Sequence, residues 1–207
     1  SRPGGIPWEV AAAVPVGART ACRVLELLAL VPGETLLVHA AAGGVGIFAT
    51  QLAIERGVRV IGTASEANHE FLRSLGASPV QYGDGLRERV LELSPEGIDA
   101  VFDASGRGEL PLSVELAHGP DRVVTIAAAQ EARELGVRFS GGPGTEVDTH
   151  AAISLAVDLL VAGRLQVPIW RTYSLADAAA AHAESERGHL RGKIVLIPDA
   201  DSAGYRS

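Results

Sequence analysis

Cysteine is almost absent from this 207-residue chain, which contains a single thiol at Cys22. One thiol excludes an internal disulfide and every zinc site built from several cysteines. Cys22 lies in an apolar pattern with Ala21, Val24 and Leu25. This pattern predicts a buried packing role for Cys22 rather than a nucleophilic one.

Long apolar runs and basic stretches are also missing. No run approaches the roughly 18–20 apolar residues of a membrane-spanning helix, and no charged-then-apolar leader opens the chain. The formal net charge is −7 without a basic stripe, which argues against nucleic acid and anionic membrane surfaces as partners. With 47% hydrophobic and 21% charged residues, the composition is that of a globular protein. We expect a cytoplasmic protein that acts on a small molecule.

From residue 35 onward, short apolar runs alternate with amphipathic segments. We expect strands at 35–39, 58–63, 79–82, 98–103, 122–126 and 136–139. We expect helices at 8–14 and 17–30, separated by Pro15, and at 44–56, 68–75, 85–93, 110–116 and 151–162. This alternation is typical of a parallel sheet covered by helices on both faces. The sequence therefore predicts an α/β fold with a doubly wound parallel sheet, the Rossmann fold.

The pattern changes after Thr149. A strand at 167–170, a helix at 175–184 and a strand at 193–197 follow, and we expect the polar tail at 199–207 to be disordered. We divide the chain into a dinucleotide-binding domain at 1–163, which includes the N-terminal connecting helix, and a C-terminal segment at 164–207.

A glycine-rich turn joins the first strand to the following helix. The segment 39–46, HAAAGGVG, fits A-x-x-G-x-x-G, a relative of the dinucleotide fingerprint. Gly43 and Gly44 allow the backbone to approach phosphate oxygens, and Gly46 allows the helix to pack closely on the sheet. The helix N-terminus offers unpaired N–H donors. The turn, including Ala42, is predicted to bind a pyrophosphate, whereas His39 is predicted to be buried and hydrogen-bonded.

The end of the second strand bears on the choice of cofactor. NAD-specific domains place an acid about 20 residues beyond the glycines, where this chain has Ala64. Ala64 and Ser65 leave room for a 2′-phosphate, but Glu66 is adjacent and no basic residue follows before Arg73. The sequence favours NADP(H), with NAD(H) as the alternative.

Many stretches of the chain resemble the medium-chain dehydrogenase/reductase superfamily, and within it the zinc-independent quinone oxidoreductases and enoyl reductases. The matching stretches lie at 11–21, 30–46, 51–65, 71–77, 98–108, 122–127, 160–182 and 188–198. They include LVPGETLLVHAAAGGVG and GHLRGKIVLIP, and together they cover nearly the whole chain from Val10 to Pro198.

The resemblance implies roles for particular residues. Thr20 resembles the family threonine that faces the nicotinamide ring, Gly43, Gly44 and Val45 resemble the pyrophosphate cradle, and Gly62, Thr63 and Ser65 resemble the adenosine-ribose contacts. Asn68 lies near the place of a phosphate-binding basic residue, and Tyr82 resembles the tyrosine that reaches the 2′-phosphate region. Ser105, Gly106, Ile126 and Ala127 resemble the loops that line the adenine and nicotinamide ends.

Two departures from the family pattern limit these implications. Zinc-dependent relatives carry a cysteine ligand four residues before the family threonine, where this chain has Val16, so we expect no zinc. The family's N-terminal catalytic domain is absent from the sequence, and residues 164–207 resemble a strand-helix-strand remnant of that domain.

The resemblance implies hydride transfer from NADPH to a quinone or an activated alkene. Two alternatives stay open: the enoyl-reductase portion of a polyketide or fatty-acid synthase, and an NADP(H)-binding module without catalysis of its own. No convincing acid–base pair is present, so the catalytic residues are not identified. Asp103 is interpreted as structural, and four further histidines are interpreted as surface or packing residues: His118, His150, His182 and His189. By analogy with relatives, we expect a homodimer paired through an edge strand at 136–139.

Overall fold

The computed structural model describes residues 5–141 and 146–198, so the tail predicted to be disordered lies outside the described residues. Six parallel strands form one sheet in the order β3-β2-β1-β4-β5-β6. They are β1 (Thr35–His39), β2 (Arg59–Ala64), β3 (Ser78–Gln81), β4 (Ala100–Asp103), β5 (Val123–Thr125) and β6 (Arg138–Phe139). This order confirms the predicted Rossmann fold. Strand β6 lies at one edge of the sheet. Pairing of two chains through this strand stays a prediction.

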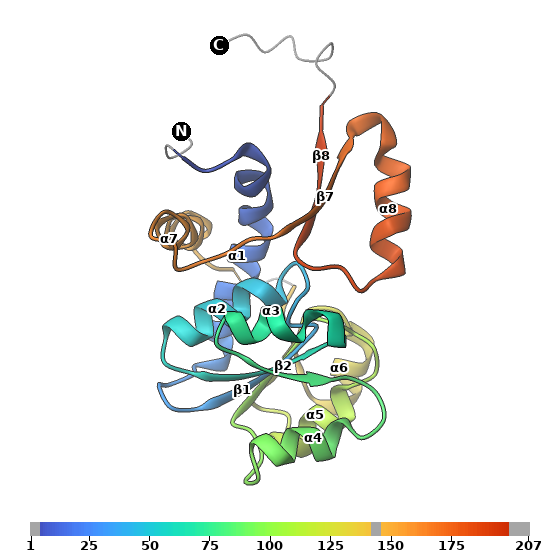
Figure 1. The fold of residues 1–207 in the computed structure, drawn as a ribbon. Coiled ribbons are helices and arrows are strands. Elements are labelled where there is room, and N and C mark those ends of the chain that lie inside the picture. The colour runs from blue at the N-terminus through green and yellow to red at the C-terminus, as the bar shows by residue number, and fades with distance from the viewer. Residues whose placement is uncertain (1–4, 142–145, 199–207) are drawn as a thin grey trace.

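Helices cover both faces of the sheet (Figure 1). One face carries α1 (Trp8–Leu28), α2 (Gly46–Glu55), η1 (Glu66–Asn68) and α3 (His69–Ser74), with α7 (Thr149–Val161) packed on α1. The other carries α4 (Leu86–Leu93), α5 (Leu110–Leu116) and α6 (Ala129–Leu135). Along β1, Leu36 and Val38 enter the first core and Leu37 enters the second, because successive side chains of a strand point to opposite faces. A strand buried on both sides explains the unbroken apolar run.

The predicted break at Pro15 is wrong, because α1 runs without interruption through this residue. Proline removes one backbone donor and its ring crowds the preceding turn, which ordinarily breaks a helix. Pro15 lies on the exposed side of α1, whereas Val14 and Ala18 on either side of it are buried. Burial of this apolar face offsets the lost hydrogen bond and keeps the two halves in one helix.

The C-terminal elements form a separate small sheet. Strands β7 (Ile169–Ser174) and β8 (Lys193–Ile197) pair in parallel, with η2 (Leu175–Asp177) and α8 (Ala178–Arg187) between them. Figure 1 shows this unit beside the upper part of α1, above the six-stranded sheet. Strand β7 begins and ends later than the predicted 167–170, and α6 was not predicted. The division at residue 164 stays a prediction. None of the helices in the described ranges has the length and apolar character needed to cross a membrane.

Candidate cofactor site

A cavity of about 440 Å³ opens at the carboxyl edge of the six-stranded sheet. It lies where the strand order reverses between β1 and β4, the usual ligand crevice of an open parallel sheet. Its volume is within the range of small-molecule sites. Five chain segments contribute its wall: the glycine turn, the end of β2, the end of β3, the loop after β4, and the chain between α8 and β8.

The glycine turn is held in a compact form that requires its small residues. Ala40 has a φ of +55°, and the Gly43 N–H donates to its carbonyl oxygen at 2.9 Å. A Cβ on Gly46 would lie 2.2 Å from that same oxygen, which belongs to the backbone and cannot move aside. In the described part of the chain, the N–H groups of Gly44 and Val45 have no hydrogen-bond acceptor in the protein. The turn can therefore offer donors to an anion.

A buried hydrogen-bonded chain supports the turn from below. The Ala40 N–H donates to Thr63 Oγ1 at 3.1 Å, and Thr63 Oγ1 lies 3.5 Å from His39 Nδ1. On the other side of the ring, His39 Nε2 lies 3.0 Å from Ser113 Oγ, which donates to the Glu109 carbonyl at 2.7 Å. Burial lowers the pKa of His39, against the opposing effect of nearby carboxylates. His39 is thus the buried, hydrogen-bonded residue that the sequence predicted.

Asp103, at the end of β4, anchors the loop on the opposite wall. Its carboxylate is buried and accepts from Thr125 Oγ1 at 2.7 Å and from the N–H groups of Ser105 and Gly106 at 2.9 and 3.1 Å. The Ser105 hydroxyl also contacts Asp103 and Glu109. With its oxygens occupied in this way, Asp103 shapes the loop, as its interpretation as a structural residue predicted.

Lys193, the first residue of β8, brings a cation to the glycine turn. A Cβ on Gly44 would lie 2.9 Å from Lys193 Nζ, so the amine rests against the turn. Lys193 is half-buried and lines the cavity, and desolvation by burial lowers its pKa. Within residues 5–141 and 146–198 it forms no ion pair. A desolvated ammonium without a counter-charge favours an anionic ligand group beside it.

The cavity brings together eight of the fourteen residues predicted for the cofactor site. These are Ala42, Gly43, Gly44, Thr63, Ser65, Asn68, Tyr82 and Ser105. Gly62 stands behind the turn, because a Cβ there would lie 2.7 Å from Ala41 Cβ. The remaining five do not line the cavity: Thr20 in α1, Val45 before α2, Gly106 in the loop after β4, and Ile126 and Ala127 after β5. Their cofactor contacts, like those of the other nine, stay predictions.

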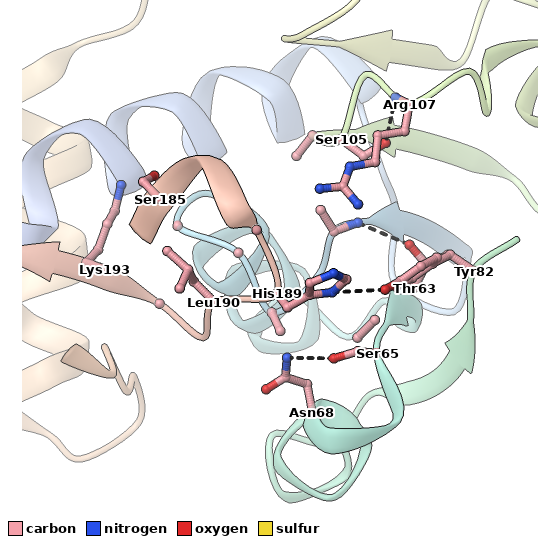
Figure 2. A pocket seen from close by; sticks show the side chains of 18 of the residues that line it. Thr63, Ser65, Asn68, Tyr82, Ser105, Arg107, Ser185, His189, Leu190 and Lys193 are labelled. Atoms are coloured by element: carbon pink, nitrogen blue, oxygen red, sulfur yellow. Dashed lines mark hydrogen bonds between the residues drawn. The ribbon is translucent and has the colours of Figure 1, made fainter. Parts of the chain in front are cut away.

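Five polar residues of the cavity wall were not predicted from the sequence. They are Arg107, Glu109, Ser185, His189 and Lys193, and the last three come from the C-terminal segment (Figure 2). His189 was interpreted only as a surface or packing residue; it is exposed, but its Nδ1 lies 3.1 Å from the Tyr82 hydroxyl. The one available signal was that Lys193 is the single lysine of the sequence.

The described residues contain no group of three or more histidine, cysteine, aspartate or glutamate side chains that could hold a metal ion. Cys22, the single cysteine of the chain, is buried in α1. The residues that the structure describes therefore do not fit a zinc site.

Comparison with known proteins assigns the chain to a family. A family model described as zinc-binding dehydrogenase matches residues 75–196. A quinone oxidoreductase of Pseudomonas aeruginosa is 32% identical over 95% of this chain and 66% of its own length. A polyketide synthase of Streptomyces halstedii, GfsB, is 32% identical over 96% of this chain but only 4% of its own length.

A solved structure supports the assignment. The native structure of a mycobacterial protein complexed with NADPH superposes with a TM-score of 0.79 at 28% identity, covering 95% of this chain and 66% of the other. The chain thus spans just under two thirds of the length of this protein and of the quinone oxidoreductase. It belongs to the zinc-binding dehydrogenase family and is a cofactor-binding domain of the medium-chain dehydrogenase/reductase superfamily.

Proposed function

We propose that this chain is the NADP(H)-binding part of an oxidoreductase that reduces a quinone or an activated alkene without zinc. The observation that carries the proposal is the cavity at the sheet's carboxyl edge, with the glycine turn on one side and the unpaired Lys193 against it. The similarity to a quinone oxidoreductase and to a protein solved with NADPH supports the same conclusion.

The residues of the cavity suit the parts of a dinucleotide. The free N–H groups of the turn and the Lys193 ammonium would hold the pyrophosphate, since amide donors and a cation together neutralise its charge. Ser65, Asn68 and Tyr82 would bind the adenosine ribose. The absence of an acid at Ala64 favours NADP(H), because no carboxylate there repels a 2′-phosphate.

A bound NADPH would supply a hydride with its two electrons, and solvent would supply the proton that completes the reduced acceptor. The chain contributes orientation: it fixes the cofactor against the rigid carboxyl edge of the sheet, where β1 and β4 diverge.

Calorimetric titration of the chain with NADPH and with NADH tests binding. We expect NADPH to bind more tightly than NADH. Lys193→Gln should weaken NADPH binding about ten- to hundredfold, the value of one charge-assisted hydrogen bond to phosphate. Lys193→Arg should retain part of the affinity. Arg133→Gln, which removes an exposed cation on α6, is the matched control and should change nothing. Absence of NADPH binding to the unmodified chain would refute the proposal.

The similarity to a polyketide synthase over 96% of the chain favours a second candidate, an enoyl-reductase portion of such a synthase. NADPH oxidation with a benzoquinone or with an enoyl thioester distinguishes the two. Faster turnover of the thioester would favour the synthase. NADPH binding without turnover of either acceptor, restored by adding the relatives' N-terminal domain, would indicate a binding module that depends on a partner domain.

A further inference from the structure

The loop at 188–191, between α8 and β8, crosses the mouth of the cavity; we call it the strap. Gly188, His189 and Leu190 line the cavity from this loop, whereas Arg191 does not line it but contacts the lining residue Asn68. Its end is tied to the glycine turn, because the Gly192 N–H donates to the Ala42 carbonyl at 2.9 Å. A Cβ on Gly192 would lie 2.0 Å from a backbone oxygen of Pro168, so only glycine fits at this position.

The strap is fastened on one side by His189. Its Nδ1 lies 3.1 Å from the Tyr82 hydroxyl, and the two rings stack with centroids 6.4 Å apart (Figure 2). Because Tyr82 follows β3, this contact places the strap beside the end of the sheet that carries β2 and β3. The ribose of a dinucleotide is expected at the same end.

Arg191 fastens the strap on the other side. Its Nε donates to Asn68 Oδ1 at 2.9 Å and its Nη2 to the Ala67 carbonyl at 3.1 Å, while the guanidinium lies 4.8 Å from the centroid of the Phe71 ring. Asn68 in turn donates to Ser65 Oγ at 3.2 Å, the first residue after β2. The guanidinium is therefore one side chain away from Ser65.

These contacts do not neutralise the positive charge of Arg191. A guanidinium carries five N–H donors, and the two acceptors named above are an amide and a carbonyl rather than carboxylates. Across the ranges that the structure describes, Arg191 forms no ion pair. The segment from Ser65 to Glu70, which contains η1 and the start of α3, has no lysine or arginine. The strap thus brings a cation to a segment that has no lysine or arginine of its own.

We propose that Arg191 is the residue by which this chain distinguishes NADP(H) from NAD(H), its guanidinium pairing with the adenosine 2′-phosphate beside Ser65. This inference rests on the proposed function. The planar guanidinium matches two phosphate oxygens at once, which a lysine cannot do. Contacts to Asn68 and Ala67 already hold the side chain in place, so little rotamer freedom is lost on binding. Selectivity is then set by a residue more than 120 positions away from the loop it serves.

Titration calorimetry with NADPH, NADH, adenosine 2′-monophosphate and adenosine 5′-monophosphate tests this assignment. Arg191→Gln should weaken NADPH and the 2′-monophosphate about ten- to hundredfold, with NADH and the 5′-monophosphate unchanged within about twofold. Arg191→Lys should lie between. The matched control is Arg187→Gln, which removes an arginine four positions earlier whose side chain is exposed and paired with Glu184. It should leave all four ligands unaffected.

Unchanged NADH affinity also shows that the Arg191→Gln variant is folded. An equal loss for NADPH and NADH would overturn the assignment, because it would indicate a general effect on the strap. An unchanged NADPH affinity would overturn it as well. If the unmodified chain binds neither dinucleotide, the proposed function itself fails, an outcome that is visible before any variant is made.

Discussion

The two edges of the six-stranded sheet differ in whether their charged and polar groups have partners within the protein. At the amino edge, Glu34 before β1 forms a two-point ion pair with Arg122 before β5, with N···O distances of 2.5 and 2.9 Å. Asp99 before β4 accepts from the Thr35 N–H at 2.7 Å. At the carboxyl edge, the N–H groups of Gly44 and Val45 lack acceptors within the described residues, and Lys193 lacks an ion pair there. The amino edge thus pairs these charged groups within the protein, whereas the carboxyl edge leaves two amides and a cation available for a ligand.

Gly46→Ala should cause the largest loss of stability. The added Cβ would lie 2.2 Å from the Ala40 carbonyl oxygen, a backbone atom that cannot move aside. We expect the free energy of unfolding to fall by roughly 2–3 kcal/mol, as for other overpacked sites. Gly44→Ala is the control, because its Cβ would meet only the flexible end of Lys193. Denaturant titration showing equal losses for both variants would contradict this account of the carboxyl edge.

Glu34→Gln should lower the free energy of unfolding by less than Gly46→Ala does. It tests the ion pair at the amino edge. The hydrogen bond from Arg122 lowers the pKa of Glu34, so the carboxylate stabilises the fold above its unfolded pKa of about 4.3 and ceases to do so as the pH falls through its lower folded pKa. We expect a loss of about 1 kcal/mol at pH 7, which shrinks in acid. Unfolding measured between pH 7 and pH 3 checks this.

The exposed pair of Arg87 and Glu115 provides the control for that experiment. Glu115→Gln should leave stability unchanged at every pH, because water screens this pair. A pH-independent effect of Glu34→Gln would mean that the amino edge does not depend on this ion pair.

Ala40→Gly should have the smallest effect. Replacement relieves the left-handed φ of +55°, a conformation that costs an L-residue about 1–2 kcal/mol, but it also adds freedom to the unfolded chain. The two terms nearly cancel, and we expect a change within about 1 kcal/mol toward greater stability. A clear destabilisation, measured by thermal unfolding, would show that packing of the Ala40 methyl group outweighs the backbone strain at this residue.

Local patterns predicted much of the fold. The bounds of β1, α5 and β8 coincide with those expected. The pattern failed where tertiary packing decides: α1 continues through Pro15 because its buried face outweighs one lost hydrogen bond. The short helix α6 has no side-chain cap and buries only Ala132, so it left little trace in the sequence.

The glycine turn was predictable because strand, turn and helix are contiguous in the chain. The strap was not, because its contacts join residues far apart in sequence. His189 meets Tyr82 across 107 positions, and Arg191 meets Asn68 across 123. No local periodicity encodes such pairs. Arg191 could not be predicted as a cation near Ser65, because the two residues are far apart in the sequence.

The hydrogen bond from Gly192 to Ala42 has a consequence for biosynthesis. A ribosome releases the glycine turn about 150 residues before the strap and β8. All six strands of the Rossmann sheet emerge during this interval, but the nucleotide crevice lacks one wall until the last strand follows. A nascent chain that ends before β8 would lack the Lys193 amine beside the glycine turn.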